Sequence, residues 1–205
     1  MFRDRIEAGH LLAGKIQRPA GNCTVTGIAR GGILTARPIA DALGCELTTI
    51  VVKKIGHPDD PEFAIGAIAE GQERKPYLNT FSSGIDRESI QYSVSRIMDE
   101  IAEMRRSLGD SNSVFRGRWD AVILVDDGSA TGTTIVAAVR SIRSSITRNI
   151  SIAVPVLSED AFDLIRSEGV PIIYAEMPYE FEAVSEFYSD FREVSVVDLY
   201  PVLKR

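Results

Sequence analysis

The strongest constraint on the fold is a run of branched apolar residues that ends abruptly in two carboxylates. The stretch Val122-Ile123-Leu124-Val125 precedes Asp126 and Asp127, and a loop of small, hydroxylated and glycine residues follows before a helical pattern begins. An unbroken apolar run suits a strand covered on both faces, as in a parallel sheet flanked by helices. Such sheets bind ligands at the carboxyl ends of their strands, so the sequence predicts a site at these carboxylates.

The loop after the carboxylates has the composition of a phosphate site. Backbone N–H groups from Gly128 to Thr133, next to a helix N-terminus, form a concavity suited to a phosphate. The carboxylates need another kind of partner, such as ribose hydroxyls or a metal ion, so the expected ligand is a phosphorylated pentose. Other signatures fail: the sequence has no Walker A lysine and no G-x-G-x-x-G, and a nucleophile elbow is excluded because Asp127, not glycine, stands two residues before Ser129.

Helical and strand patterns alternate along the chain. Helices are expected at residues 2–16, 33–43, 87–108, 132–146 and 159–167, and strands at residues 22–28, 46–53, 64–69, 121–125, 151–156 and 171–175. The buried stripe of the first helix is expected to be Phe2, Ile6, Ala13 and Ile16. The alternation predicts an α/β fold with a doubly wound parallel sheet.

Helix ends are marked by capping residues, and two segments are irregular. Asp86 is the expected N-cap of the longest helix, while Gly44 and Gly109 are expected helix stops. Residues 55–77 carry three prolines and read as less regular. Residues 177–205 are expected to form a small irregular cap over the site, within a single domain spanning residues 1–205.

Composition excludes several classes of function. The net charge of −6 and the pI of about 5.1 argue against broad binding of nucleic acid or a membrane surface. No apolar stretch is long enough to span a bilayer and the N-terminus lacks a signal-peptide core, so the expected location is the cytoplasm. Cys23 and Cys45 read by default as two small buried thiols; a disulfide between them is plausible chiefly in a hyperthermophile.

The acidic stretch resembles the PRPP-binding motif of type I phosphoribosyltransferases, with two acidic residues, three small ones and then Thr-Gly-x-Thr. The resemblance implies that Asp126 and Asp127 contact the ribose hydroxyls of PRPP. It implies that the loop Gly128, Ser129, Ala130, Thr131, Gly132 and Thr133 holds the 5-phosphate. Mg²⁺ is then the implied cofactor, held mainly by PRPP and through water by the two carboxylates.

Two further segments fit the same family. The loop Ala29-Arg30-Gly31-Gly32 resembles the pyrophosphate loop, in which Arg30 would bind the leaving group and the glycines would let the backbone approach it. Lys53 and Lys54 resemble the basic pair before a mobile catalytic loop, although a solvated charge pair is an equal alternative. The run His57-Pro58-Asp59-Asp60-Pro61-Glu62 suits a hydrated loop better than a metal site.

Ala130 bears on the acceptor. In the hypoxanthine-guanine branch an aspartate usually occupies this position, so alanine looks more like the adenine or uracil branches and does not choose between them. Tyr179, Phe181 or Phe187 of the tail would stack on the acceptor, with plain core packing as the alternative. Residues 2–9, 64–71 and 183–191 resemble a poorly characterised prokaryotic branch of the family.

The resemblance implies a transferase of nucleotide metabolism. It would move 5-phosphoribosyl from PRPP to a purine or pyrimidine base and release pyrophosphate, with Asp126, Asp127, Arg30, Lys53 and Lys54 as its catalytic residues. A homodimer is usual in such families. The rival interpretation is a regulatory protein that binds PRPP or a nucleotide and transfers nothing, and hydrolysis at the same site is a weaker third one.

Overall fold

The apolar run before Asp126 forms the middle strand of a parallel sheet. The computed structural model describes residues 1–72 and 75–204, apart from the side chain of Glu62. Within that part of the chain, the strands of this sheet follow the order β2-β1-β6-β7-β8. Their bounds are β1 Cys23–Ile28, β2 Glu46–Ile50, β6 Ala121–Val125, β7 Ile150–Val156 and β8 Ile172–Glu176. The predicted doubly wound parallel sheet is confirmed.

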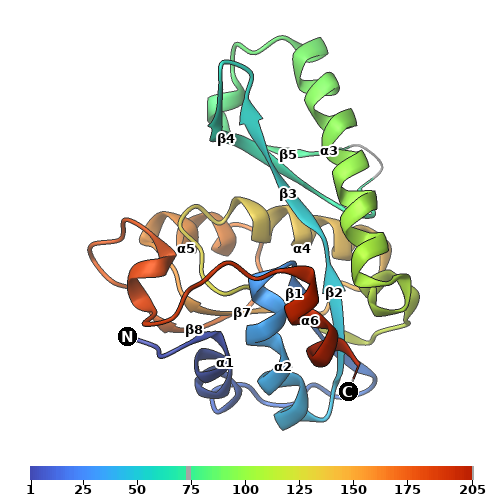
Figure 1. Cartoon of the computed structure of the whole chain (residues 1–205), viewed down its shortest axis with the longest axis vertical. Coiled ribbons are helices and arrows are strands. Elements are labelled where there is room, and N and C mark those ends of the chain that lie inside the picture. Colours follow the sequence, from blue (N-terminus) through green and yellow to red (C-terminus); the bar gives the residue numbers. More distant parts are fainter. Residues whose placement is uncertain (73–74, 205) are drawn as a thin grey trace.

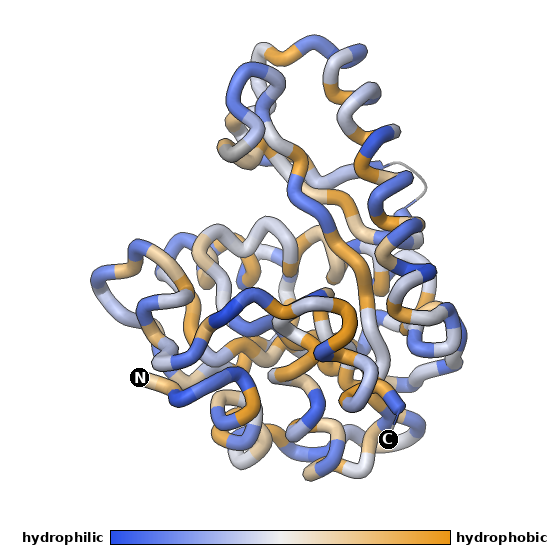
Figure 2. The backbone as a smooth tube through the Cα atoms, in the orientation of Figure 1, coloured by the Kyte–Doolittle hydropathy of each residue, from blue (hydrophilic) through white to orange (hydrophobic). Residues whose placement is uncertain are grey.

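Helices cover both faces of this sheet (Figure 1). One layer is α1 (Arg5–Ala13) with α2 (Gly31–Leu43), and the other is α4 (Thr133–Ser145) with α5 (Glu159–Arg166). Alternate side chains of β6 enter two different cores: Ile123 and Val125 pack on the α2 side, and Val122 and Leu124 on the α4 side. Figure 2 shows the resulting apolar interior, which explains why the run of β6 has no polar residue. We call the sheet and these helices the body.

The single strand predicted at residues 46–53 is wrong, because the chain leaves the parallel sheet at Val51. β2 ends at Ile50, and β3 (Val52–His57) pairs antiparallel with β4 (Asp60–Ala69), which pairs with β5 (Tyr77–Leu78). These three strands and α3 (Arg87–Leu108) project from the body in Figure 1, and we call them the arm. Of the hydrated loop expected at residues 57–62, only Pro58 and Asp59 form the turn of the β3–β4 hairpin, and the other residues belong to the two strands.

The arm is more regular than its prolines suggested because it has an apolar core of its own. Ile55, Ile65 and Ile68 pack with Val94 and Ile101 of α3. One short 3-10 turn precedes α3 and two follow it. Their bounds are η1 Thr80–Ser82, η2 Asp110–Asn112 and η3 Val114–Arg116. None of the described helices, α3 included, combines the length and apolar character needed to cross a membrane.

The predicted helix ends are confirmed. Asp86 caps α3 by accepting a hydrogen bond from the N–H of Ser89 at 2.8 Å, and Gly109 follows its last turn. Gly44 ends α2 in the left-handed conformation, with φ of 61°. Each of these helix ends is determined by a single capping residue close in the sequence, which is why the sequence predicted them.

The first helix is shorter than predicted and buries a different stripe. Asp4 caps α1 by accepting from the N–H of Glu7 at 2.8 Å, so the helix starts at Arg5 instead of residue 2. Its buried residues are Arg5, Ala8, Gly9 and Leu12, not the expected stripe that included Ile6 and Ala13. Phe2 is buried outside the helix, where its N–H donates to the carbonyl oxygen of Phe187 at 2.7 Å.

The tail at residues 177–205 contains the 3-10 turn η4 (Val184–Phe187) and the helix α6 (Val196–Leu203). The tail, expected to be irregular, therefore ends in a helix, and Pro201 lies within it. Pro201 removes one backbone hydrogen bond of the helix. Ser195 and Asp198 form a capping box at its start and Leu199 is fully buried, and these contributions offset the loss.

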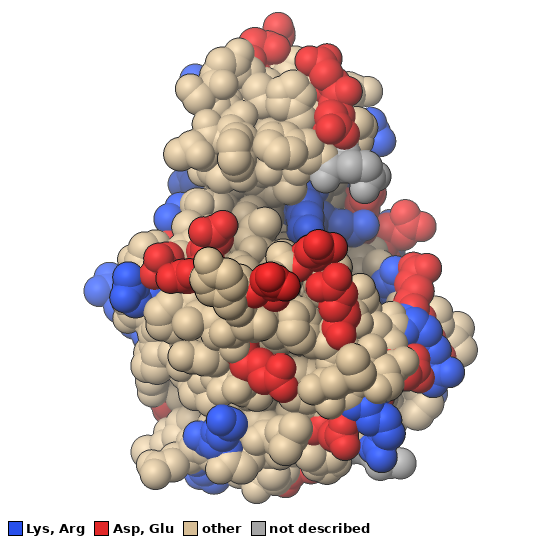
Figure 3. All heavy atoms as spheres, turned by 90° about the vertical axis from the view of Figure 1, so that its left-hand side faces the viewer, with Lys and Arg blue, Asp and Glu red and all other residues tan. Residues whose placement is uncertain are grey.

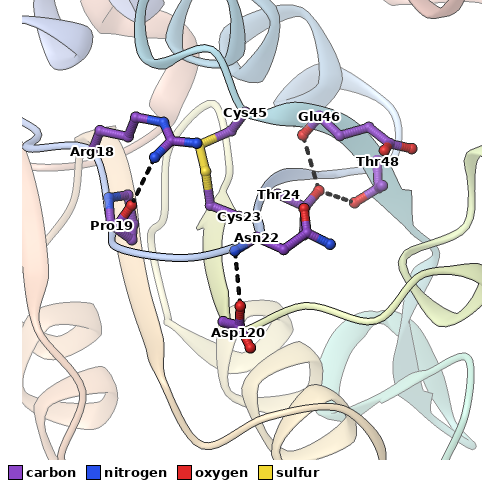
Figure 4. The surroundings of a disulfide bond; sticks show 9 residues. All are labelled: Arg18, Pro19, Asn22, Cys23, Thr24, Cys45, Glu46, Thr48 and Asp120. Atoms are coloured by element: carbon purple, nitrogen blue, oxygen red, sulfur yellow. Dashed lines mark hydrogen bonds between the residues drawn. A yellow bond between two sulfur atoms is a disulfide. The ribbon is translucent and has the colours of Figure 1, made fainter.

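The default expectation of two free thiols is also wrong. Cys23 and Cys45 form a disulfide at the amino ends of β1 and β2 (Figure 4). The register of the two strands pairs Thr24 with Glu46, which places the preceding cysteines side by side. This register depends on the packing of the whole sheet, so the spacing of the cysteines did not reveal it. The bond lies at the end of the sheet opposite the predicted site.

Candidate active site

Two of the predicted loops meet where the strand order of the sheet reverses. β2 lies on one side of β1 and β6 on the other. The register pairs Gly27 with Val125, so the loops that follow β1 and β6 start at the same level. A Cβ on Gly32 would lie 2.6 Å from the carbonyl oxygen of Val125, so glycine is required for this close approach. Open α/β sheets bind their ligands in crevices of this kind.

The loop at residues 128–133 is shaped by its own hydrogen bonds. The Ser129 hydroxyl accepts from the N–H of Gly132 at 3.0 Å, and Gly132, with φ of 71°, leads into α4. The hydroxyl of Thr131 donates to that of Thr133 at 3.1 Å. Ser129 and Thr133 are buried, whereas Thr131 is exposed. A phosphate bound at this loop, as expected from the sequence, would therefore contact backbone N–H groups and the Thr131 hydroxyl, whereas Ser129 is too buried for direct contact.

Asp126 and Asp127, which follow β6, have different surroundings. Burial raises the pKa of the Asp126 carboxyl well above its usual range, and the neighbouring charge of Asp127 adds to the shift. A hydrogen bond from the Asp127 N–H at 3.0 Å and the positive charge of Lys54 act in the opposite direction. Asp127 instead has a cation in direct contact, since Arg5 Nε donates to its Oδ2 at 2.6 Å.

Sequence reasoning missed Arg5. Its side chain is 9% exposed and that of Asp127 is 16% exposed, so the ion pair is largely shielded from solvent. The Arg5 guanidinium also lies 3.8 Å from the centre of the Phe191 ring and donates to the carbonyl oxygen of Arg192 at 3.0 Å. The available signal was positional: Arg5 precedes the buried Ala8 by three residues, so it lies on the buried face of α1.

The two predicted lysines point in different directions because they alternate on β3. Lys53 Nζ lies 3.1 Å from Glu100 Oε2 of α3, and it also lines the cavity described below. Lys54 is the lysine whose charge acts on Asp126. The strand predicted at residues 46–53 ended at Lys53, but in the structure both lysines lie within β3.

A cavity of about 500 Å³ opens between the arm, the loop after β1 and the tail. Charged and apolar side chains share its lining, which includes Arg5, Arg30, Lys53, Glu193, Phe191 and Met104. Arg30 Nη2 pairs with Glu193 Oε1 at 2.6 Å and so links the loop to the tail. Figure 3 shows basic side chains in the hollow between arm and body, with acidic side chains grouped beneath them.

The tail closes over the loop after β6. The hydroxyl of Tyr188 donates to the backbone carbonyl oxygen of Asp127 at 2.6 Å. Burial, followed by the negative charge of Asp127, raises the pKa of Tyr188 above its usual range, so its hydroxyl stays a donor. Val184 packs so closely on Gly128 that a Cβ there would overlap it. Ala130, two residues after Gly128 in the same loop, is exposed.

The aromatic residues expected to stack on an acceptor have other surroundings. Tyr179 is fully exposed. Phe181 and Phe187 pack on each other with ring centres 5.2 Å apart, in a cluster that includes Phe2 and Tyr188. Of the tail aromatics, Phe191 lines the cavity.

Comparison with known proteins agrees with this geometry. Residues 4–168 match the model of the phosphoribosyl transferase domain. The chain belongs to the phosphoribosyl transferase domain family. Its curated relatives include MT0597 and Rv0571c, inferred phosphoribosyl transferases of two Mycobacterium tuberculosis strains, each 30% identical over the whole of this chain. The chain spans about half of their length, 47% in each case.

A solved structure shares the fold over almost its full length. The protein TT1426 from Thermus thermophilus is 33% identical, with a TM-score of 0.79, and the alignment covers 98% of this chain and 97% of that one. The type I phosphoribosyltransferase-like fold expected from the motifs is confirmed by the family match together with the parallel sheet, and TT1426 shares the fold of the tail as well.

Proposed function

We propose that the protein transfers the 5-phosphoribosyl group from PRPP to a nitrogenous base and releases pyrophosphate. The observation that carries this proposal is the meeting of the Asp126–Asp127 pair with the Arg30–Gly31–Gly32 loop at the strand-order reversal. The first supplies acceptors for ribose hydroxyls, and the second supplies a cation and accessible backbone for phosphates. Family membership of residues 4–168 supports the same reaction class.

The two carboxylates would act on the sugar. As the bond between C1 and the pyrophosphate oxygen breaks, positive charge grows on the ribose ring. Carboxylates placed beside that ring stabilise the transition state more than the ground state, which is the condition for catalysis. Asp127, whose Oδ2 is held by Arg5, would accept a ribose hydroxyl at Oδ1, and Asp126 would lie behind it.

The leaving pyrophosphate would bind the cations around the cavity. Arg30 and Lys53 line it, but each is paired with a carboxylate, Glu193 or Glu100. Both pairs are partly exposed, and ion pairs of this kind contribute about 1 kcal/mol or less. Pyrophosphate, which carries more charge than a carboxylate, would therefore exchange readily for either partner.

Mg²⁺ fits this site as an ion that arrives with PRPP. Among the described residues no group of three or more His, Cys, Asp or Glu side chains is arranged to hold a metal ion. The local donor set is Asp126 and Asp127, and one oxygen of Asp127 already accepts from Arg5. When bound, Mg²⁺ neutralises phosphate charge, and the two carboxylates would bind its water ligands.

The acceptor base would occupy the part of the cavity beneath the tail, where Phe191 offers an aromatic face. Ala130 cannot donate or accept a proton through its side chain, so the residue that serves an acceptor must come from elsewhere. Glu193 lines the same cavity, and its carboxyl group can exchange a proton with a base, so we assign this role to Glu193. The base remains a purine or pyrimidine of unspecified identity.

The test is pyrophosphate release from Mg²⁺–PRPP with adenine, guanine, hypoxanthine, uracil and orotate. Asp126→Asn/Asp127→Asn is the blank, and Asp163→Asn, an exposed carboxylate of α5, is the matched control. We expect release that depends on one base, persists in the control and vanishes in the blank. Base-dependent release that survives in the blank would refute the roles of the two carboxylates.

The alternative is a protein that binds PRPP or a nucleotide without transfer. It predicts no release with any base but a rise in thermal stability with Mg²⁺–PRPP, about 2.7 kcal/mol at 100 times Kd. Lys53, Lys54 and the arm favour a transferase, because a protein that only binds PRPP needs no site for a leaving pyrophosphate. We further propose one domain for residues 1–205, with a cytoplasmic location and a homodimeric state as accompanying predictions.

A further inference from the structure

Arg5 is a buried cation that the proposed chemistry does not explain. A type I site needs a carboxylate for the ribose, but it does not need an arginine from the first helix on that carboxylate. Removing a charge from water is costly, so a buried arginine requires compensating partners. Arg5 has them in Asp127 Oδ2 at 2.6 Å, the Arg192 carbonyl oxygen at 3.0 Å and the Phe191 ring at 3.8 Å.

These partners connect three segments that are far apart in the sequence. Arg5 comes from α1, Asp127 follows β6, and Phe191 belongs to the tail. Tyr188, also of the tail, holds the same Asp127 by its backbone oxygen at 2.6 Å. Asp127 is therefore fixed at its side chain by one end of the chain and at its backbone by the other.

The loop after β1 completes this arrangement. A Cβ on Gly31 would overlap Asp127 Oδ2 and approach Arg5 Nε. The pyrophosphate loop therefore packs directly on the ion pair, and only a glycine permits it. Asp127 is enclosed between that loop and Arg5, which restricts the rotation of its carboxyl group.

We propose that Arg5 is a positioning residue that holds Asp127 by one oxygen and directs the other at the ribose. An ionised carboxylate has about four lone-pair sites on two oxygens, so Arg5 on Oδ2 leaves Oδ1 for a ribose hydroxyl. Holding a reacting group in place removes the entropy of ordering it in the transition state. Arg5 thus acts through Asp127, and this role rests on the proposed transfer reaction.

The test compares Arg5→Ala, Arg5→Lys and Arg3→Ala in pyrophosphate release from Mg²⁺–PRPP with the five bases named above. Arg3 is the matched control, because it neighbours Asp4 on the same helix end but its side chain is 70% exposed. We expect Arg5→Ala to lose about a hundredfold in kcat, with a much smaller change in the KM of the base. Arg5→Lys should recover part of the loss and Arg3→Ala should match the wild type.

Two measurements separate positioning from folding. Guanidinium chloride at millimolar concentration should restore part of the kcat of Arg5→Ala, because the small cation can occupy the vacated position beside Asp127. Tyr188→Phe, which removes only the hydroxyl that holds the Asp127 backbone, should also lower kcat while the far-ultraviolet spectrum stays unchanged. A loss in Arg5→Ala without guanidinium rescue, together with wild-type kcat in Tyr188→Phe, would indicate a structural role and overturn the proposal.

The pyrophosphate-release assay also distinguishes failure of the proposed transfer reaction from failure of the positioning role of Arg5. A wild-type protein that releases no pyrophosphate and binds no Mg²⁺–PRPP by calorimetry would refute the proposed function, and the role of Arg5 with it. A wild-type protein that transfers phosphoribosyl, with Arg5→Ala equally active, would refute the role of Arg5 alone.

Discussion

Replacing Arg105 by methionine should destabilise the protein strongly, because it removes one partner of a buried ion pair at the base of the arm. The Arg105 side chain is 10% exposed and that of Glu70 is 11% exposed. Arg105 donates to both Glu70 carboxylate oxygens and to the Thr49 hydroxyl at 2.9 Å. Glu70 in turn accepts from the N–H of Val51 at 3.0 Å. The pair therefore lies where β2 ends and the arm begins.

The magnitude follows from the burial. Loss of one partner leaves the other charge uncompensated in a region that water barely reaches, which costs about 3–5 kcal/mol. For a chain of this size that corresponds to a fall in Tm of about 6–20 °C. Methionine retains much of the volume of the arginine stem, so the cost is chiefly electrostatic and from lost hydrogen bonds.

Calorimetry or urea unfolding of Arg105→Met, Glu70→Gln and the double variant would measure this. The double variant should lose less than the sum of the single variants, because neither charge is then left alone. Arg116→Met is the matched control, since its pair with Asp110 has side chains 65% and 62% exposed. It should cost less than about 1 kcal/mol. Equal losses in Arg105→Met and Arg116→Met would refute the reasoning.

Three other predictions follow from the geometry. Gly31→Ala should abolish pyrophosphate release in an assay of the folded variant, because the added Cβ would overlap Asp127 Oδ2; wild-type turnover would contradict this packing. Cys23→Ala/Cys45→Ala should lower the free energy of unfolding by about 3 kcal/mol, as expected for a closed loop of this length, and an unchanged urea midpoint would argue against the bond. The pKa of Asp126 is raised in the folded protein, so its contribution to stability is full below the unfolded pKa and is lost as pH rises through the folded pKa. Asp126→Asn should therefore stabilise the ligand-free protein at pH 8 but not at pH 4, and an equal effect at both values would refute that shift.

Local chemistry made much of the body predictable from the sequence. The apolar run before Asp126, the cap at Asp86 and the stop at Gly44 each depend on residues within one turn or strand. The motif loops followed from the same kind of evidence, because a strand that ends in carboxylates and glycines has few interpretations. Their meeting at the strand-order reversal needed only the rule that parallel strands share their carboxyl edge.

The missed features depend on contacts between distant segments. Where the chain leaves the sheet, the N–H of Val51 donates to Glu70, nineteen residues later in the sequence. The disulfide required the register of β1 against β2, and the burial of Arg5 required Asp127 and Phe191. A charged residue at a helix start looks exposed until its partner, more than a hundred residues away, is known.

The site therefore divides into a part that the motifs describe and a part that they do not. The family match ends at residue 168, whereas three residues beyond it reach the site: Tyr188 binds the Asp127 backbone, and Phe191 and Glu193 line the cavity. The matched region contains both loops that we propose to bind phosphate, so under the proposed reaction it would hold the phosphoribosyl and pyrophosphate groups. Ala130 removes the proton donor that one branch places within that region. If the proposed reaction is right, the choice of acceptor would lie with the tail and with the first helix that supports it, so variants of the tail should change which base is used before they change the binding of PRPP.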